Sequence, residues 1–131
     1  MPLRILIVDD HRLARDAVRT AVGFCRSGQP DIVGEAADGA TAIELARRLK
    51  PDVITMDIGL PDMMGLEVTR RLKAEMPQVK VVVVTVHKDR EYQEEAVKAG
   101  AVSYITKEHL IHELPSCLDH LAGQRSVWDA E

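Results

Sequence analysis

The chain has 131 residues, of which 46% are hydrophobic, and a formal net charge of −4 at pH 7. This length suits one domain with a two- or three-layer core and leaves no room for a second folded domain. The acidic balance argues against binding of nucleic acid or an anionic membrane by this domain itself, because both require a basic surface. The sequence has no run of roughly 20 apolar residues that could cross a bilayer and no signal-peptide pattern. We therefore expect a cytoplasmic protein.

Short runs of β-branched and apolar residues alternate along the chain with longer segments of helical character. The strand candidates are, in chain order, residues 3–8, 31–35, 53–56, 79–84 and 102–105. The helix candidates between and after them are residues 14–21, 42–49, 65–76 and 90–99, followed by a last apolar stripe at Leu114, Cys117, Leu118 and Leu121. The chain therefore predicts five strands alternating with five helices.

Several helix ends carry recognisable signals. Asp38 is placed to cap the helix at 42–49, and Pro51 predicts that this helix ends before Lys50. Gly100 is placed to stop the preceding helix.

Proline lacks an N–H group and is tolerated in the first turn of a helix. Because Pro115 lies inside the last apolar stripe, we expect this helix to begin around Ile111 or His112. After Leu121 the apolar period is lost, so residues 123–131 are predicted to form a C-terminal tail or the start of a linker, and residues 1–122 the domain.

The strands are apolar on both faces, as residues 81–84 (VVVV) illustrate. Such strands, alternating strictly with helices, call for a parallel sheet covered by helices on both sides. The predicted class is therefore α/β.

Polar residues that can do chemistry cluster where the predicted strands end. Asp9 and Asp10 follow the first strand, Asp57 follows the third, Thr85 the fourth, and Lys107 the fifth. In an open parallel sheet the carboxyl ends of the strands line one edge, where ligands bind. These five residues are therefore expected to converge in one crevice.

Three carboxylates held together repel one another unless a cation shares the site. A hard divalent ion, most plausibly Mg²⁺, suits this set of oxygen ligands, and it also reduces repulsion between a phosphoryl donor and an anionic nucleophile. Asp57 is then the natural nucleophile, forming an acyl phosphate. Lys107 supplies a further positive charge, and the hydroxyl of Thr85 can hydrogen-bond a phosphoryl oxygen.

Four motifs bring these residues together in a known order: residues 7–11 (IVDDH), 52–61 (DVITMDIGLP) with Gly65 beyond, 83–85 (VVT) and 99–107 (AGAVSYITK). With these motifs, the sequence resembles the response-regulator receiver family of two-component signalling over about residues 3–122. The resemblance implies the flavodoxin-like (βα)5 fold, a doubly wound five-stranded parallel sheet with strand order 2-1-3-4-5.

The resemblance also implies the role of each site residue. Asp57 would be the phosphoacceptor for a sensor histidine kinase, and Thr85 and Lys107 would bind the phosphoryl group. Mg²⁺ would be held by Asp9, Asp10, Asp57 and the main-chain carbonyl of Gly59. Tyr104 matches the switch aromatic that responds to movement of the threonine.

Residues 85–89 (TVHKD), together with Glu108 after the lysine, look most like the NarL/FixJ subfamily. That subfamily usually joins its receiver to a C-terminal helix-turn-helix domain, which is absent here, so any DNA contact would come from another segment. The chain is expected to be either a receiver cut from a longer regulator, which residues 122–124 (AGQ) and the tail favour, or a single-domain regulator. The resemblance implies transcription control, formation of a homodimer on phosphorylation, and a signalling phosphoacceptor rather than an enzyme.

Two other classes of function share part of this pattern. A Mg²⁺-dependent phosphohydrolase of the haloacid dehalogenase type also forms an aspartyl phosphate, but it places a second acid two residues after the nucleophile, where this chain has Gly59. A receiver-shaped interaction module that no longer accepts phosphate would not need the full set of Asp9, Asp10, Asp57, Thr85 and Lys107.

Overall fold

The computed structural model describes residues 2–130, with side chains as far as residue 124. Its strands are β1 (Arg4–Val8), β2 (Asp31–Ala36), β3 (Val53–Met56), β4 (Lys80–Thr85) and β5 (Ser103–Thr106). They form one parallel five-stranded sheet in the order β2-β1-β3-β4-β5. This confirms the fold class and the strand order predicted from the sequence.

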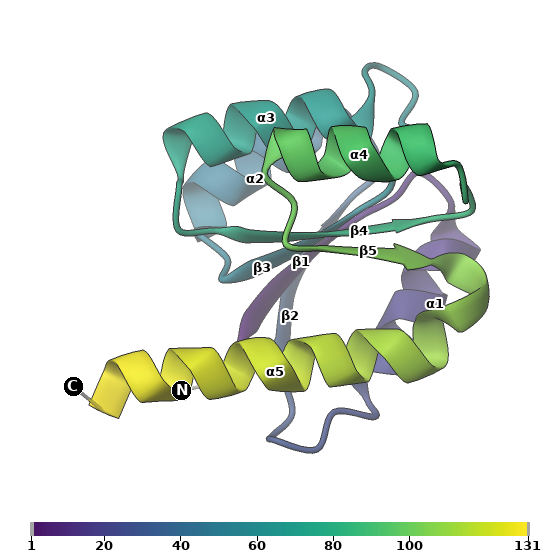
Figure 1. Cartoon of the computed structure of the whole chain (residues 1–131). Helices are drawn as coiled ribbons and strands as arrows, with labels where there is room; N and C mark the ends of the chain where they lie inside the picture. Colours follow the sequence, from purple (N-terminus) through teal and green to yellow (C-terminus); the bar gives the residue numbers. More distant parts are fainter. Residues whose placement is uncertain (1, 131) are drawn as a thin grey trace.

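The helices are α1 (Arg12–Val22), α2 (Gly39–Leu49), α3 (Gly65–Glu75), α4 (Arg90–Ala99) and α5 (Leu110–Ala130), with a 3-10 turn η1 (Lys107–His109) before α5. Helices α1 and α5 lie on one face of the sheet, and α2, α3 and α4 on the other (Figure 1). The molecule is therefore a three-layer sandwich.

Strand residues alternate between the two layers of the core. In β1, Ile5 and Ile7 pack with α1 and α5, whereas Leu6 and Val8 pack with α2 and α3. All four side chains are buried. This double burial accounts for the continuous apolar runs in the strands, because each face of the sheet is covered by helices.

The helix-end signals are confirmed. The carboxylate of Asp38 accepts a hydrogen bond from the N–H of Thr41 at 2.7 Å, which caps α2. Helix α2 ends at Leu49, and Lys50 takes the left-handed conformation with φ of 49°. Gly100 ends α4 with φ of 102°, a conformation that glycine adopts without a Cβ clash.

The last helix differs from its prediction at both ends. It begins at Leu110, so Pro115 lies in its second turn rather than its first. The η1 turn, which the sequence analysis did not predict, leads directly into the helix, and the proline removes the single hydrogen bond that its N–H would have donated.

At the other end, α5 continues to Ala130, so the predicted tail is helical as far as the structure describes it. An apolar stripe marks the part of a helix that packs on a core and not the end of the helix itself, so loss of the apolar period did not mark a helix end. The division at residue 122 between domain and linker stays a prediction.

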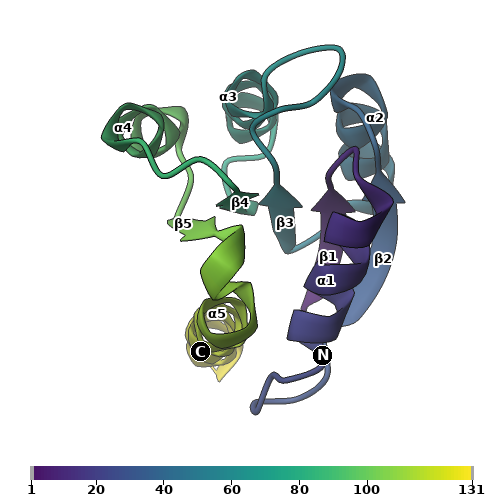
Figure 2. The same cartoon turned by 90° about the vertical axis from the view of Figure 1, so that its right-hand side faces the viewer.

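The carboxyl ends of all five strands lie at one edge of the sheet (Figure 2). The loops that leave this edge carry the predicted site residues. Within residues 2–130, none of the helices combines the length and apolar character needed to cross a membrane.

Candidate functional site

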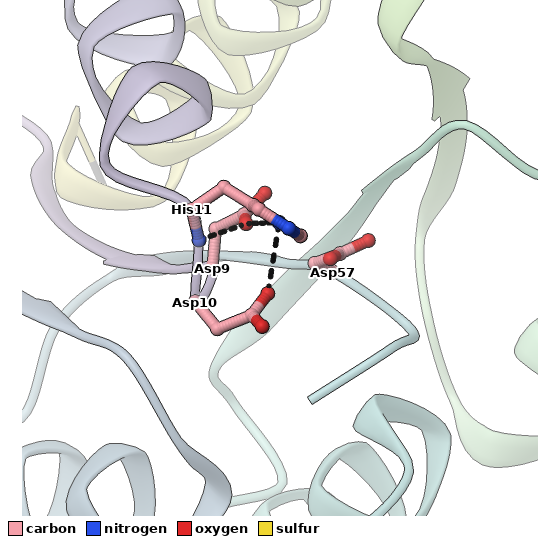
Figure 3. A group of neighbouring side chains, drawn as sticks. All are labelled: Asp9, Asp10, His11 and Asp57. Atoms are coloured by element: carbon pink, nitrogen blue, oxygen red, sulfur yellow. Dashed lines mark hydrogen bonds and ion pairs between the residues drawn. The ribbon is translucent and has the colours of Figure 1, made fainter. Parts of the chain in front are cut away.

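The three predicted carboxylates come together at this edge of the sheet. Asp9 and Asp10 lie between β1 and α1, and Asp57 directly follows β3 (Figure 3). One ligand atom from each of Asp9, Asp10, His11 and Asp57 lies within 4.8 Å of all the others. The predicted convergence of the acids is therefore confirmed, and His11 joins them.

Lys107 neutralises part of this negative charge. Its Nζ lies 2.8 Å from Oδ2 of Asp9 and 3.8 Å from Oδ2 of Asp57. The lysine side chain is 20% exposed, and the Asp9 side chain 3%. The ammonium group thus bridges two carboxylates in a region that water reaches poorly.

Asp57 is buried, and its main-chain neighbour Ile58 donates an N–H to Oδ1 at 2.9 Å. Burial raises the pKa of the Asp57 carboxyl above its ordinary value, and the charge of Asp9 raises it further. Lys107, the Ile58 N–H and the hydroxyl of Thr85 oppose this rise only in part. The site thus makes ionisation of Asp57 less favourable than that of a carboxyl group in water.

One carboxylate oxygen of the cluster has an unused bonding capacity. Oδ1 of Asp10 is buried and makes no hydrogen bond within the described residues. It lies 3.0 Å from Nδ1 of His11, a contact that becomes an ion pair only when the imidazole is protonated. A buried oxygen without a donor, among three acids, fits a hard divalent cation. The acidic cluster can thus bind a metal ion.

Thr85 is fully buried at the end of β4 and begins a chain of contacts towards β5. Its Oγ1 accepts a hydrogen bond from the N–H of His87 at 3.3 Å. The carbonyl of His87 in turn accepts the hydroxyl of Tyr104 at 2.8 Å. Thr85 and Tyr104 are therefore linked through one residue of the β4–α4 loop.

The loop after Asp57 is closed by a glycine. A Cβ on Gly65 would lie 1.9 Å from the carbonyl oxygen of Asp57, so no larger residue fits without a backbone shift. The N–H of Gly65 donates to the carbonyl of Ile58 at 2.7 Å, and Gly59 forms an isolated bridge with Met64. This turn contains Gly59, two residues after Asp57. The role of Gly59 as a metal ligand stays a prediction.

Asp62 in the same loop binds the start of α2. Its carboxylate accepts the N–H groups of Gly39 at 2.7 Å and Ala40 at 2.9 Å. These two bonds, that of Gly39 foremost, hold the pKa of Asp62 below its ordinary value.

The sequence analysis missed one residue that contacts the acids. Arg15 of α1 donates from Nη1 to the main-chain carbonyl of Asp9 at 2.8 Å and from Nε to Glu35 of β2 at 2.8 Å. The only sequence signal for this role of Arg15 was a cation in the first turn of a helix that begins at the site. Arg15 binds a main-chain atom of Asp9, and no sequence pattern identifies such a partner.

Comparison with known proteins agrees with this geometry. Residues 5–119 match the family described as the response regulator receiver domain. The chain belongs to the response-regulator receiver family. It is 38% identical over 126 residues, 95% of its length, to the response regulator GacA of Pseudomonas aeruginosa, and covers 58% of that protein.

Two further relatives define the branch of the family. The response regulator protein VraR of Staphylococcus saprophyticus is 34% identical over 131 residues, the full chain, which covers 62% of that protein. A two-component response regulator of the LuxR family from Aurantimonas sp. SI85-9A1 superimposes with a TM-score of 0.85 at 33% identity, covering 94% of this chain and 87% of that one. These relatives support the predicted resemblance to the NarL/FixJ subfamily.

The chain spans about three fifths of the length of GacA and VraR, at 58% and 62%. The match concerns the receiver part of such proteins.

Proposed function

We propose that this chain is a phosphorylation-activated receiver domain in which Asp57 accepts a phosphoryl group from a sensor histidine kinase. The observation that carries the proposal is the position of Asp57, buried at the end of β3 with Lys107 and a second acid, Asp9, beside it. A receiver needs a nucleophile that is shielded from water yet faces cations that can stabilise a phosphoryl group.

The acids fit Mg²⁺, which Asp9, Asp10, Asp57 and the main-chain carbonyl of Gly59 would hold. When bound, Mg²⁺ offsets the negative charge of the carboxylates and of the incoming phosphoryl group. The unbonded oxygen of Asp10 supports this assignment, as does the preference of Mg²⁺ for oxygen ligands over the imidazole of His11.

The transfer is a displacement at phosphorus. A carboxylate oxygen of Asp57 forms a bond to phosphorus while the bond between phosphorus and the kinase imidazole breaks, and the electron pair leaves with the imidazole nitrogen. Lys107 pairs with a phosphoryl oxygen, and the hydroxyl of Thr85 donates to another. Because the other ring nitrogen of the phosphorylated imidazole carries a proton during the transfer, the products are an acyl phosphate on Asp57 and a neutral imidazole on the kinase.

The contacts of Thr85 suggest how phosphorylation alters a surface. When its hydroxyl turns to a phosphoryl oxygen, Oγ1 no longer accepts the N–H of His87 in the present geometry. The loop can then move, and with it the carbonyl that holds the hydroxyl of Tyr104. A few kcal/mol of new charge-assisted hydrogen bonding is enough to shift such a two-position element.

The output of this switch is part of the same proposal, and the relatives support it. The domain acts as a signalling phosphoacceptor in the cytoplasm, assists its own phosphorylation and dephosphorylation, and forms a homodimer when phosphorylated. Residues 1–122 make no DNA contact themselves, and DNA would be bound by a C-terminal helix-turn-helix domain. The relative described as a LuxR-family response regulator supports this reading.

Phosphorylation is tested by incubating the protein with acetyl phosphate and Mg²⁺ and weighing the intact chain. We expect one phosphoryl group on the wild type, none on Asp57→Asn, and none after chelation of the metal. Asp16→Asn, which changes an exposed acid of α1, is the matched control and should react as the wild type does. Undiminished phosphorylation of Asp57→Asn would refute the proposal, and absence of phosphorylation in the wild type would favour the interaction module instead.

The switch is tested by amide hydrogen exchange with and without beryllium fluoride, a phosphoryl mimic. We expect altered exchange in α4 and β5 of the wild type, and a much smaller response in Thr85→Ala. Tyr104→Phe keeps the ring and removes only the hydroxyl. A full response in Thr85→Ala would show that the coupling runs by another route.

A further inference from the structure

Arg15 connects the acidic cluster to the neighbouring strand β2. Its guanidinium donates to the carbonyl of Asp9 and to Oε1 of Glu35, both at 2.8 Å. The Arg15 side chain is 18% exposed, so water competes poorly for these bonds. The second oxygen of Glu35 accepts Nε of Arg19 at 2.6 Å. Glu35 therefore holds the Arg15 guanidinium through Nε, while the Asp9 carbonyl binds a different nitrogen, Nη1.

The carbonyl that Arg15 binds belongs to the peptide bond between Asp9 and Asp10. Because that bond is planar, holding its oxygen restricts the backbone of both acids at once. On the other side of Asp9, its own N–H donates to the carbonyl of Ala36 in β2 at 3.0 Å. Asp9 is thus tied to the end of β2 on both sides, directly through its own N–H, and through its carbonyl by way of Arg15 and Glu35.

We propose that Arg15 is a positioning residue for the metal site, which holds the Asp9–Asp10 peptide in the orientation that directs both carboxylates at the cation. This inference rests on the proposed function, since it assigns a role within the same site. Groups that orient metal ligands from behind typically contribute a 10- to 100-fold effect on metal affinity.

A guanidinium suits this role better than an ammonium group. It presents several N–H donors in a rigid plane and stays charged, so it can hold a carbonyl and a carboxylate together. A lysine at position 15 keeps the positive charge but has no such fork. Arg15→Lys therefore separates the effect of geometry from the effect of charge.

The experiment compares Arg15→Met, Arg15→Lys and Arg19→Met with the wild type. Arg19→Met is the matched control, because Arg19 binds the same Glu35 but has no contact with Asp9 among the described hydrogen bonds. Mg²⁺ affinity is measured by NMR titration of the amide resonances. Urea unfolding in EDTA reports how well each variant folds.

We expect Arg15→Met to weaken Mg²⁺ binding by about tenfold, Arg15→Lys by less, and Arg19→Met by no more than about twofold. With acetyl phosphate as donor, the Mg²⁺ concentration for half-maximal phosphorylation should rise in Arg15→Met by the same factor. The maximal rate at saturating Mg²⁺ should stay near that of the wild type, since Asp57 itself is untouched.

Equal Mg²⁺ affinities of Arg15→Met and Arg19→Met would overturn the inference, and so would a loss of stability without a loss of affinity. A phosphorylation rate of Arg15→Met that stays below that of the wild type even at saturating Mg²⁺ would also count against it. If the wild type binds Mg²⁺ but is not phosphorylated, the proposed function fails. The Mg²⁺ affinities of the variants would still test the positioning role of Arg15. Absence of Mg²⁺ binding by the wild type would refute both.

Discussion

Replacing Lys107 by methionine should destabilise the metal-free protein and leave it dependent on Mg²⁺. Methionine keeps the length and the apolar stem of the side chain and removes only the charge. Lys107 lies 2.8 Å from a carboxylate oxygen of Asp9 and 3.8 Å from one of Asp57. Removing it leaves the buried acids without the cation that now balances them.

The size of the effect follows from these distances. At an effective dielectric constant of about 20, unit charges 2.8 Å and 3.8 Å apart attract by about 6 and about 4 kcal/mol. Most of this gross attraction offsets the desolvation of the three groups, and loss of one partner from a buried ion pair costs about 3–5 kcal/mol. Because Lys107 keeps 20% of its exposure, we expect a loss of about 3 kcal/mol.

The assay is urea unfolding followed by circular dichroism, in EDTA and in saturating Mg²⁺. A ligand at 100 times its Kd stabilises the native state by about 2.7 kcal/mol. Mg²⁺ supplies positive charge to the same carboxylates as Lys107, so it should stabilise Lys107→Met more than the wild type. The difference between the two proteins should therefore narrow when the metal is added.

The matched control is Lys88→Met. Lys88 pairs with Glu108 at 2.6 Å, but the two side chains are 64% and 49% exposed. Exposed pairs of this kind contribute little to stability, so Lys88→Met should unfold as the wild type does, with or without Mg²⁺. Equal losses in the two lysine variants would refute the view that the charges of the site act in a shielded environment.

Three further changes test other contacts of the fold. Gly65→Ala should lose about 1–3 kcal/mol of stability in urea unfolding, because its Cβ meets the carbonyl of Asp57, whereas Gly59→Ala, with open space around its Cβ, should not. Asp62 has a folded pKa below its ordinary value of 3.8, so its contribution is present above that pH and is lost as the pH falls through the folded pKa. When the free energy of unfolding is measured in urea at several pH values, it should therefore fall less steeply towards acid pH in Asp62→Asn than in the wild type. Tyr104→Phe removes one hydrogen bond and should cost about 1 kcal/mol in the same assay.

The order of strands and helices could be predicted because each face of the sheet imposes its own pattern. Residues 81–84 are apolar throughout, since Val82 and Val84 pack on one face while Val81 and Val83 pack on the other. Strand bounds shifted by one residue at most in β1, β2, β4 and β5, and β3 matched at both ends. Such small shifts are expected where a strand leaves the sheet gradually.

The last helix was harder to predict because the signals at its ends are not apolar. Its start follows the η1 turn, whose residues Lys107, Glu108 and His109 carry no apolar period. Its continuation beyond residue 122 carries no apolar period in the sequence. Apolar periodicity reports which helix residues face a core, and it does not report where the helix ends.

The acidic cluster was predicted from topology alone, since parallel strands deliver Asp9, Asp10 and Asp57 to one edge. The contacts that orient these acids were not predicted, because most of them use main-chain atoms. The carbonyl of Asp9 binds Arg15, and the amide and carbonyl of His87 bind Thr85 and Tyr104. Every residue type except proline offers both main-chain groups, so a sequence motif cannot mark them.

Gly65 is different, because its main-chain contact with Asp57 does restrict the residue type in the sequence. There the main chain itself is the obstacle, since the carbonyl of Asp57 occupies the space of a Cβ, and only glycine satisfies that geometry. A main-chain contact thus restricts the residue type in the sequence when it excludes a side chain. A main-chain group that only accepts a hydrogen bond from a side chain does not restrict its own residue type. In this site the carbonyl of Asp57 makes a contact of the first kind with Gly65, and the carbonyl of Asp9 makes a contact of the second kind with Arg15. Substitutions beside Asp57 should therefore act through steric exclusion, whereas substitutions behind Asp9 and Asp10 should act through lost orientation, which added metal can restore.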